Sequence, residues 1–363
     1  MSWKLAFTRL AIAGAVFGAI IPVDLAAQEA AAAEGAVVAA TREPAVLFRD
    51  LEPIEFTLRA NYRSLHRSKT RASAEHNAVL SLAGADGSQL DIPLRVRSRG
   101  HWRLKNCVIP PLRLNFQKTH TEGTPFASLD KNRLVMHCRD NDEFDQYVLR
   151  EYQLYRVLNT LTDISHRARL ARVTYVDSAT SNPITTRYAF ILEEDSEMAE
   201  RSGGKLLKAQ GAKVGDLDPY HDALVGVFQY MVGNVDWSVA GLHNVLLVQK
   251  GVNVYATVYD FDFTGTVRTR YSVPDYRLPI SNTRQRLFRG YCAGADEYDQ
   301  VFAWFNDRKE TIFALYSESD PVGKLLDRRY ADETLRYFEE FYKIINDRGL
   351  ARDRIVRSCL QSQ

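Results

Sequence analysis

The stretch GNVDWSVAGLHNVLLVQKGVNVYATVYDFDF, residues 233–263, decides the fold of the second half of the chain. Residues 245–249 and 254–259 are rich in β-branched and apolar side chains, which is typical of strands. Lys250-Gly251 between them is typical of a tight turn. The stretch therefore predicts a β-hairpin whose two outer ends lie side by side.

Polar residues flank this hairpin. Asn244 precedes its first strand and Asp260 ends its second, so we expect the two to meet, with Asp236 beside them. Asp262 falls on the same side as Asp260, because side chains alternate along a strand. Amide and carboxylate oxygens are the ligands that Mg²⁺ prefers. Asn244, Asp260 and Asp262 are therefore candidate metal ligands, and Asp236 is a candidate group to orient or deprotonate an attacking hydroxyl.

The pattern also has other interpretations. Asp-x-Asp after a strand occurs in ordinary turns, and Asn244 could simply cap one. A metal-dependent hydrolase could use Asp236, Asp260 and Asp262 as well. His243 could orient a catalytic group, but we expect a structural histidine.

The chain before residue 201 predicts mainly strands, and the chain after it mainly helices. Apolar residues alternate, as strands require, in segments 54–58, 78–82, 89–96, 111–116, 171–176 and 186–192. Pro93 places the third of these at an edge or a bulge. Val148, Tyr152, Tyr155 and Leu158 recur at helical spacing, and Asp218-Pro219 is typical of a helix start.

Arginines gather on the early strands. Arg95, Arg97 and Arg99 alternate onto one strand face, and Arg113 lies on a later strand. Such a face either binds an anion or is simply solvated. Glu151 could pair with one of these arginines, but we expect it at the surface.

The N-terminus predicts export. A basic start and the apolar run Leu10–Ile21 are typical of a signal peptide, which we expect at 1–27, and residues 28–41 form an Ala-rich linker. An uncleaved N-terminal anchor is the alternative. No later stretch is apolar enough to span a membrane, so we expect a periplasmic or secreted protein.

Four cysteines fit an oxidising compartment. We favour the pairs Cys107–Cys138 and Cys292–Cys359, because each stays within one half of the chain, and free thiols are the alternative. The 47 Lys and Arg residues against 45 Asp and Glu give a net charge of only +2, so we expect no nucleic-acid partner.

Residues 90–265 resemble the CotH-type kinases, the spore-coat protein H family of atypical kinases. GNVDWSVAGLHNVLLV and VYATVYDFDFTG resemble that family's Gly-Asn-x-Asp motif, His-Asn pair, two strands and closing Asp-x-Asp. RVRSRGHW, PPLRLNF and LREYQLYRVLN resemble its Arg-rich strand, the following strand and its helix. Asp236 and Asn244 are further apart than in the family, so residues 239–241 are expected to loop out.

This resemblance implies an α+β, bilobal, protein-kinase-like fold, with a β-rich N-lobe at 42–200 and a mostly helical C-lobe at 201–363. It implies Asp236 as the catalytic residue and Asn244 and Asp260 as holders of Mg²⁺ or Mn²⁺. Arg97, Arg99 and Arg113 would bind the phosphates of ATP where the family has lysines.

The function implied is that of an exported atypical kinase, which transfers a phosphoryl group from a nucleotide to a hydroxyl of a secreted or envelope protein. The alternative is a non-catalytic, pseudokinase-like binding or structural protein of the envelope.

Overall fold

The computed structural model describes residues 42–67, 74–84, 86–100 and 102–361. The expected signal peptide and linker lie outside these residues. The described residues all belong to one compact unit, and the boundary expected after residue 200 falls inside helix α6, Asp195–Arg201. Within the described ranges, no helix is long and apolar enough to cross a bilayer.

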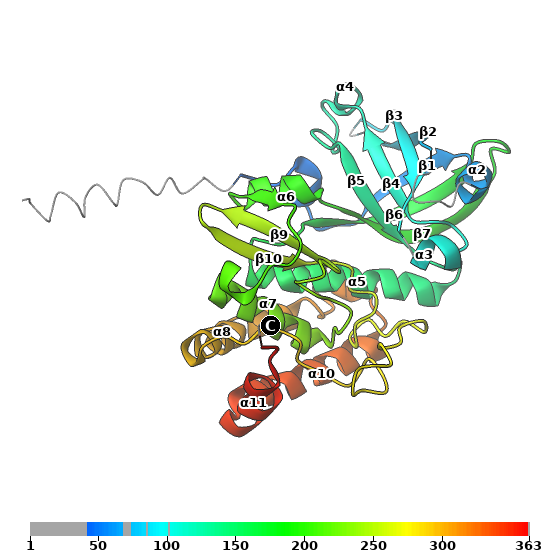
Figure 1. Ribbon diagram of the computed structural model, residues 1–363. Coiled ribbons are helices and arrows are strands. Elements are labelled where there is room, and N and C mark those ends of the chain that lie inside the picture. Colours follow the sequence, from blue (N-terminus) through cyan, green and yellow to red (C-terminus); the bar gives the residue numbers. More distant parts are fainter. Residues whose placement is uncertain (1–41, 68–73, 85, 101, 362–363) are drawn as a thin grey trace, which may run out of the picture. The chain divides into compact units, whose positions relative to one another are not determined.

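Strands of the first half close into a barrel in the order β1-β2-β3-β4-β5-β7-β6 (Figure 1). Their bounds are β1 Ile54–Ala60, β2 His76–Ala83, β3 Gln89–Ser98, β4 Leu112–Phe116, β5 Lys131–Met136, β6 Ala168–Asp177 and β7 Pro183–Leu192. The pairs are antiparallel except β1 with β6, which is parallel and closes the barrel.

The alternation of apolar residues decides which side chains fill the barrel. In β3, Ile92, Leu94 and Val96 are buried while Arg95 is exposed, as the pattern predicts. Pro93 pairs with β2, whereas the pairing with β4 begins only at Leu94. β3 lies between β2 and β4 in the closed barrel and pairs with both, so the expected edge strand is wrong. The strand tolerates Pro93 because the side that faces β4 is unpaired at this position.

The expected bilobal, protein-kinase-like fold is wrong. The β-rich half forms a closed mixed barrel, and the later half adds a second, smaller sheet to its helices. Closure depends on β1, which pairs in parallel with β6 from Ile54 opposite Ala171 to Ala60 opposite Asp177. Alternation shows which face of a strand is buried, but it does not identify a partner strand so distant in sequence.

The smaller sheet has the order β10-β9-β8, with β8 Lys205–Leu207, β9 Val245–Lys250 and β10 Asn253–Val258. β9 and β10 are antiparallel, from Lys250 opposite Asn253 to Val245 opposite Val258. The predicted hairpin is therefore confirmed.

Two helices position the site. α5, Asp142–Leu161, packs on β6 and β7, and α7, Pro219–Val232, packs on β10 (Figure 1). The Asp218 side chain accepts a hydrogen bond from the backbone of His221, as the predicted cap requires. The other α-helices are α2 Tyr62–Arg67, α3 Trp102–Asn106, α4 Lys118–Thr121, α8 Ala295–Asp307, α9 Lys309–Ala314, α10 Arg328–Asn346 and α11 Arg348–Arg354. The 3₁₀ turns are Val46–Arg49, Val214–Asp216, Gly323–Leu325 and Val356–Ser358.

Both predicted disulfides are present. Cys107 bonds to Cys138, and Cys292 bonds to Cys359. All four cysteines are thereby paired, as is typical of proteins that fold in oxidising compartments.

Candidate functional site

The open end of the β9–β10 hairpin brings Asn244 and Asp260 together. The backbone N–H of Tyr259 donates to the carbonyl of Asn244 at 3.1 Å, which extends the ladder by one step. Asn244 and Asp260 both have positive φ, 54° and 64°. Non-glycine residues in this region are uncommon, and they cluster at functional sites. The backbone N–H of Asp260 donates to the hydroxyl of Tyr155 on α5, 3.0 Å away.

Asp236 lies beside Asn244, as predicted. The Asn244 side-chain amide donates to the Asp236 carbonyl at 2.8 Å and to its Oδ2 at 3.2 Å. His243 Nε2 lies 2.9 Å from Oδ1 of the same carboxylate. Our expectation of a merely structural His243 therefore missed its contact with Asp236. The side chains of both remain accessible, Asp236 at 41% and His243 at 59%.

The long spacing between Asp236 and Asn244 is taken up by a tight loop. Ser238 and His243 exchange two backbone hydrogen bonds of 3.0 Å each, and Leu242 N–H donates to the Val239 carbonyl. Residues 239–242 thus project as a turn, as expected for 239–241. After the turn, the chain reaches Asn244, which lies next to Asp236.

Two neighbouring pockets, of about 330 and 340 Å³, meet at the hairpin end. Both are lined by Arg99, Arg133, Asn244, Tyr259 and Asp260. All seven residues predicted for the site line one or both: Arg97 and Arg113 the first, Asp236 and Asp262 the second, and Arg99, Asn244 and Asp260 both. The structure therefore gathers in one place residues that come from β3, β4 and the hairpin.

A row of arginines forms the wall of the first pocket. Arg97, Arg113 and Arg133 lie directly opposite one another on β3, β4 and β5. Like charges in this arrangement repel and destabilise a sheet, so the row favours a bound anion. Arg113 is 3.7 Å from Glu194, and Arg133 pairs with Asp195.

Arg97 and Arg99 have no carboxylate within ion-pair distance among the described side chains. Burial, together with the neighbouring Arg133, lowers the pKa of Arg99 to about 10, so it stays positively charged at neutral pH. These two guanidinium groups are the ones most available to an incoming anion.

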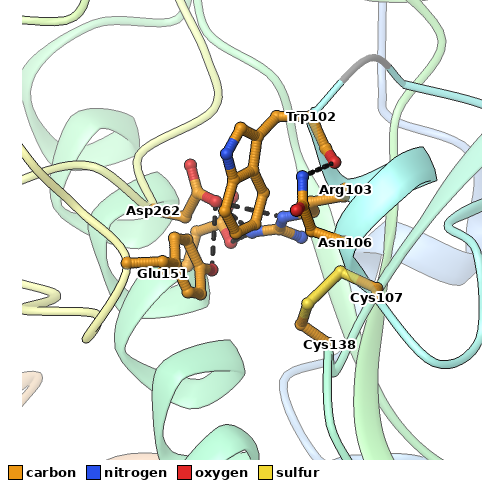
Figure 2. Close-up of a disulfide and its surroundings, with 8 residues drawn as sticks. Trp102, Arg103, Asn106, Cys107, Cys138, Glu151 and Asp262 are labelled. Atoms are coloured by element: carbon orange, nitrogen blue, oxygen red, sulfur yellow. Dashed lines mark hydrogen bonds and ion pairs between the residues drawn. A yellow bond between two sulfur atoms is a disulfide. The ribbon is translucent and has the colours of Figure 1, made fainter.

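Arg103, Glu151 and Asp262 form a buried ion cluster that lines the second pocket and is called its floor below. Figure 2 shows these side chains beside the Cys107–Cys138 disulfide. Arg103 on α3 donates from Nη2 to Glu151 Oε2 at 2.9 Å and lies 2.8 Å from Asp262 Oδ2. The side chains of Arg103, Glu151 and Asp262 are only 14%, 2% and 8% exposed. Our expectation of Glu151 at the surface is therefore wrong, and its partner is Arg103 rather than Arg95, Arg97 or Arg99.

The electrostatics of this cluster are dominated by burial. Burial raises the pKa of Glu151. The charges of Asp262 and Asp260 raise it further, whereas the charge of Arg103 lowers it. Burial likewise raises the pKa of Asp262 against the attraction of Arg103. Both carboxyl groups therefore hold a proton more readily than exposed ones do, and a cation bound beside them would compete with that proton.

Oxygen atoms remain for a cation. Arg103 and Tyr271 bind only Oδ2 of Asp262, and Glu151 Oε1 is buried with no hydrogen-bond partner among the residues that the structure describes. The amide nitrogen of Asn244 points at Asp236, which leaves its oxygen. In the described part of the chain, no three His, Cys, Asp or Glu side chains form a metal site by themselves. Asn244 and Asp260 could hold a hard cation that takes its remaining ligands from phosphate and water.

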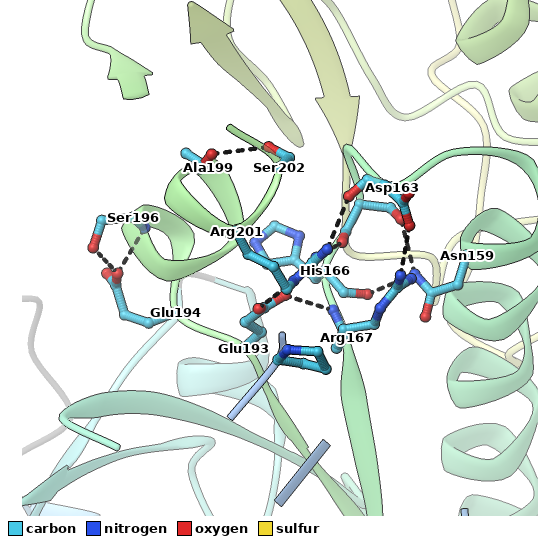
Figure 3. Close-up of polar contacts among 12 residues, drawn as sticks. Asn159, Asp163, His166, Arg167, Glu193, Glu194, Ser196, Ala199, Arg201 and Ser202 are labelled. Atoms are coloured by element: carbon cyan, nitrogen blue, oxygen red, sulfur yellow. Dashed lines mark hydrogen bonds and ion pairs between the residues drawn. The ribbon is translucent and has the colours of Figure 1, made fainter. Parts of the chain in front are cut away.

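The end of β7 and the start of α6 contribute Glu194 and Asp195 to the lining of the first pocket. Figure 3 shows the polar contacts of this segment. Glu193 pairs with Arg201, 2.8 Å away, and both side chains are buried. His166 Nε2 lies 2.8 Å from Asp195. Burial would raise the pKa of Asp195, but His166 and Arg133 outweigh it and hold the pKa well below its ordinary value. Asp195 is thereby fixed and charged beside the arginine row.

Sequence reasoning missed Arg103, Arg133 and Tyr259. Arg133 lies on β5, a strand we did not predict, and its guanidinium sits 5.0 Å from the centre of the Tyr259 ring. A scan against protein-family models and a search of curated proteins found no match for the chain.

Proposed function

We propose that this protein transfers a phosphoryl group from a nucleotide, with ATP as the donor, to a hydroxyl of a secreted or envelope protein. One observation supports the proposal above all others. Asp236, Asn244 and Asp260 meet at the junction of two pockets, beside arginines whose charge suits phosphate. The motif resemblance to the CotH-type kinases supports the same chemistry.

Each residue has a role that follows from its place. Arg97, Arg99 and Arg113 bind the phosphates, since guanidinium groups clamp such oxygens in pairs. Arg103 adds a cation at the floor of the second pocket. Asn244 and Asp260 would hold Mg²⁺ or Mn²⁺, and the bound ion would supply positive charge against the phosphates. Asp262 could contribute its Oδ1 as a further ligand.

Asp236 orients the acceptor hydroxyl and accepts its proton. Its side chain is accessible from solvent, as a group that meets a protein acceptor must be. His243 and Asn244 hold the carboxylate from two sides, so its position does not depend on the acceptor.

Export is part of the proposal. The N-terminal pattern predicts it, and the two disulfides are of the kind that forms outside a reducing cytoplasm. Acceptors in the envelope or outside the cell follow from that location.

Metal-dependent nucleotide binding is the first test. With ATP and Mg²⁺ or Mn²⁺ at about 100 times Kd, we expect about 2.7 kcal/mol of added stability, seen as a rise in the unfolding midpoint. Asp260→Ala should abolish the rise. Asp299→Ala, an exposed change on α8, should leave it intact. A wild-type chain with no metal-dependent shift would contradict the proposal.

Transfer itself is the second test. Asp236→Asn should keep the ATP-dependent shift but lower transfer of the γ-phosphate to exported proteins about 10²–10⁴-fold, because it removes the proton acceptor.

A non-catalytic nucleotide-binding protein is the second candidate. One observation favours it, namely that both oxygens of Asp236 already have partners in His243 and Asn244. A metal-dependent shift without any transfer would decide for this candidate.

A further inference from the structure

The helix that carries Arg103 is a single short turn within a long connection. α3 spans Trp102–Asn106, between the end of β3 at Ser98 and the start of β4 at Leu112. So short a helix is not stable by itself and depends on tertiary anchors. At the base of the connection, the Arg99 N–H donates to the Pro111 carbonyl at 2.8 Å.

The Cys107–Cys138 disulfide fixes the other end of this turn (Figure 2). Cys107 follows α3 directly, and its N–H donates to the Arg103 carbonyl at 3.0 Å. Cys138 lies between β5 and α5, and its carbonyl accepts from Val108 N–H at 3.0 Å. Both cysteines are about 95% buried. The bond therefore ties the Arg103 turn to the chain that leads into α5, the helix of Glu151.

From this anchored turn, two side chains reach the segment that follows Asp260. Arg103 binds Asp262, as described above. Trp102 stacks on Tyr271 with 4.6 Å between ring centres and meets Phe263 edge-on at 6.1 Å. Tyr271 in turn donates to Asp262 at 3.1 Å. The turn thus joins α5 to residues 260–271, and these include the proposed metal ligand Asp260.

We propose that the Cys107–Cys138 disulfide is a positioning device for Arg103, so that the candidate site is complete only in the oxidised chain. Arg103 acts here as a positioning residue, because it holds Glu151 and Asp262 in place. The bond forms by exchange with an oxidised dithiol partner. The two thiols of Cys107 and Cys138 lose two protons and two electrons, and the partner's disulfide is reduced to two thiols.

The compartment would therefore control whether the candidate site is formed, a consequence that rests on the proposed function. In a reduced chain, the short turn loses its covalent anchor, and Arg103 no longer fixes two buried carboxylates. Their burial then favours movement of Glu151 and Asp262 toward water. The chain would lack an ordered phosphate and metal site in the ATP-rich cytoplasm and gain it after export.

The second disulfide offers a matched control. Cys292–Cys359 joins the segment before α8 to the C-terminal tail, and neither cysteine lines the two pockets. We would compare Cys107→Ser/Cys138→Ser with Cys292→Ser/Cys359→Ser in the full chain by amide hydrogen exchange. The first pair should speed exchange in 99–111 and also in 259–271, at least tenfold. The control pair should change neither segment.

The proposal would be overturned if exchange in 259–271 did not change in Cys107→Ser/Cys138→Ser. It would also be overturned if exchange in this segment changed equally in the two double variants. If the first variant does not fold, Arg103→Lys tests the second half of the proposal, that Arg103 holds residues 259–271, because it keeps the disulfide and changes only the cation. It should speed exchange in 259–271 but not in 99–111. Equal protection of 259–271 in Arg103→Lys and in the wild type would also count against the proposal.

Nucleotide measurements separate this inference from the proposed function. With ATP and Mn²⁺, the first variant should bind about tenfold more weakly than wild type and the control pair within twofold. A wild-type chain that binds no nucleotide would contradict the proposed function, while the exchange result would still decide whether the disulfide positions Arg103. Equal affinity of all three proteins would overturn the role of the disulfide in the site.

Discussion

The two sides of the second pocket are built in opposite ways. On the floor, Arg103, Glu151 and Asp262 are almost fully buried and joined by charge. At the mouth, Asp236 and His243 are about half exposed and joined by one hydrogen bond. Burial makes the floor rigid at the cost of desolvated charge. Exposure leaves the mouth adaptable and open to a second molecule, which suits a proposed acceptor site.

Removal of Arg103 should give the largest effect on stability. Arg103→Met leaves Glu151 and Asp262 buried without their cation, and breaking such a cluster costs about 3–5 kcal/mol. Urea unfolding at pH 7 measures the loss. The loss should shrink as the pH falls, because burial raises the pKa of both carboxyl groups and a protonated carboxyl group needs no cation.

Arg268→Met is the matched control. Arg268 pairs with a single carboxylate, that of Glu333, and its side chain is 42% exposed. We expect a loss of no more than about 1 kcal/mol. Equal losses in the two variants would mean that burial does not set the strength of the Arg103 cluster.

Asp222 sharpens the comparison, because it is buried and no described side chain forms an ion pair with it. Burial alone raises the pKa of Asp222 to about 7, and its Oδ1 has no hydrogen-bond partner among the described residues. In the unfolded chain the pKa is the ordinary 3.8. The folded state therefore holds the proton more tightly, and stability falls as the pH rises from about 4 through 7.

Asp222→Asn should remove this fall. The variant should match wild type near pH 4 and exceed its free energy of unfolding by about 2–4 kcal/mol at pH 8. Thermal or urea unfolding at both pH values checks this. A wild-type stability with the same pH dependence as the variant would show that Asp222 is not a source of it.

What could be predicted from the sequence was mostly local. The β9–β10 hairpin follows from two short apolar runs and a glycine turn, so Asn244, Asp260 and Asp236 could be placed together. The cap at Asp218 and the pairing of cysteines within each half also followed from short-range arguments.

The barrel and the floor of the pocket depend on contacts that are distant in sequence. Arg103 meets Glu151 and Asp262 across separations of 48 and 159 residues, and no short pattern encodes such pairs. Glu151 did carry a usable signal. It lies three residues after Val148 and four before Tyr155, on the apolar face of α5, where a charged residue needs a buried partner.

The smallest effect on transfer and stability is expected from substitution of His243. The substitution tests whether His243 serves only to orient Asp236. In His243→Gln, the side-chain amide can still donate to Asp236, so transfer should stay within about tenfold of wild type, and stability within about 1 kcal/mol. His243→Leu removes the donor and should lower kcat more than KM changes, because Asp236 would lose one of its two supports. Rates measured at saturating ATP and varied acceptor concentration separate the change in kcat from the change in KM. If Gln and Leu lower kcat equally, hydrogen bonding to Asp236 is not what His243 provides, and the imidazole itself must meet the acceptor.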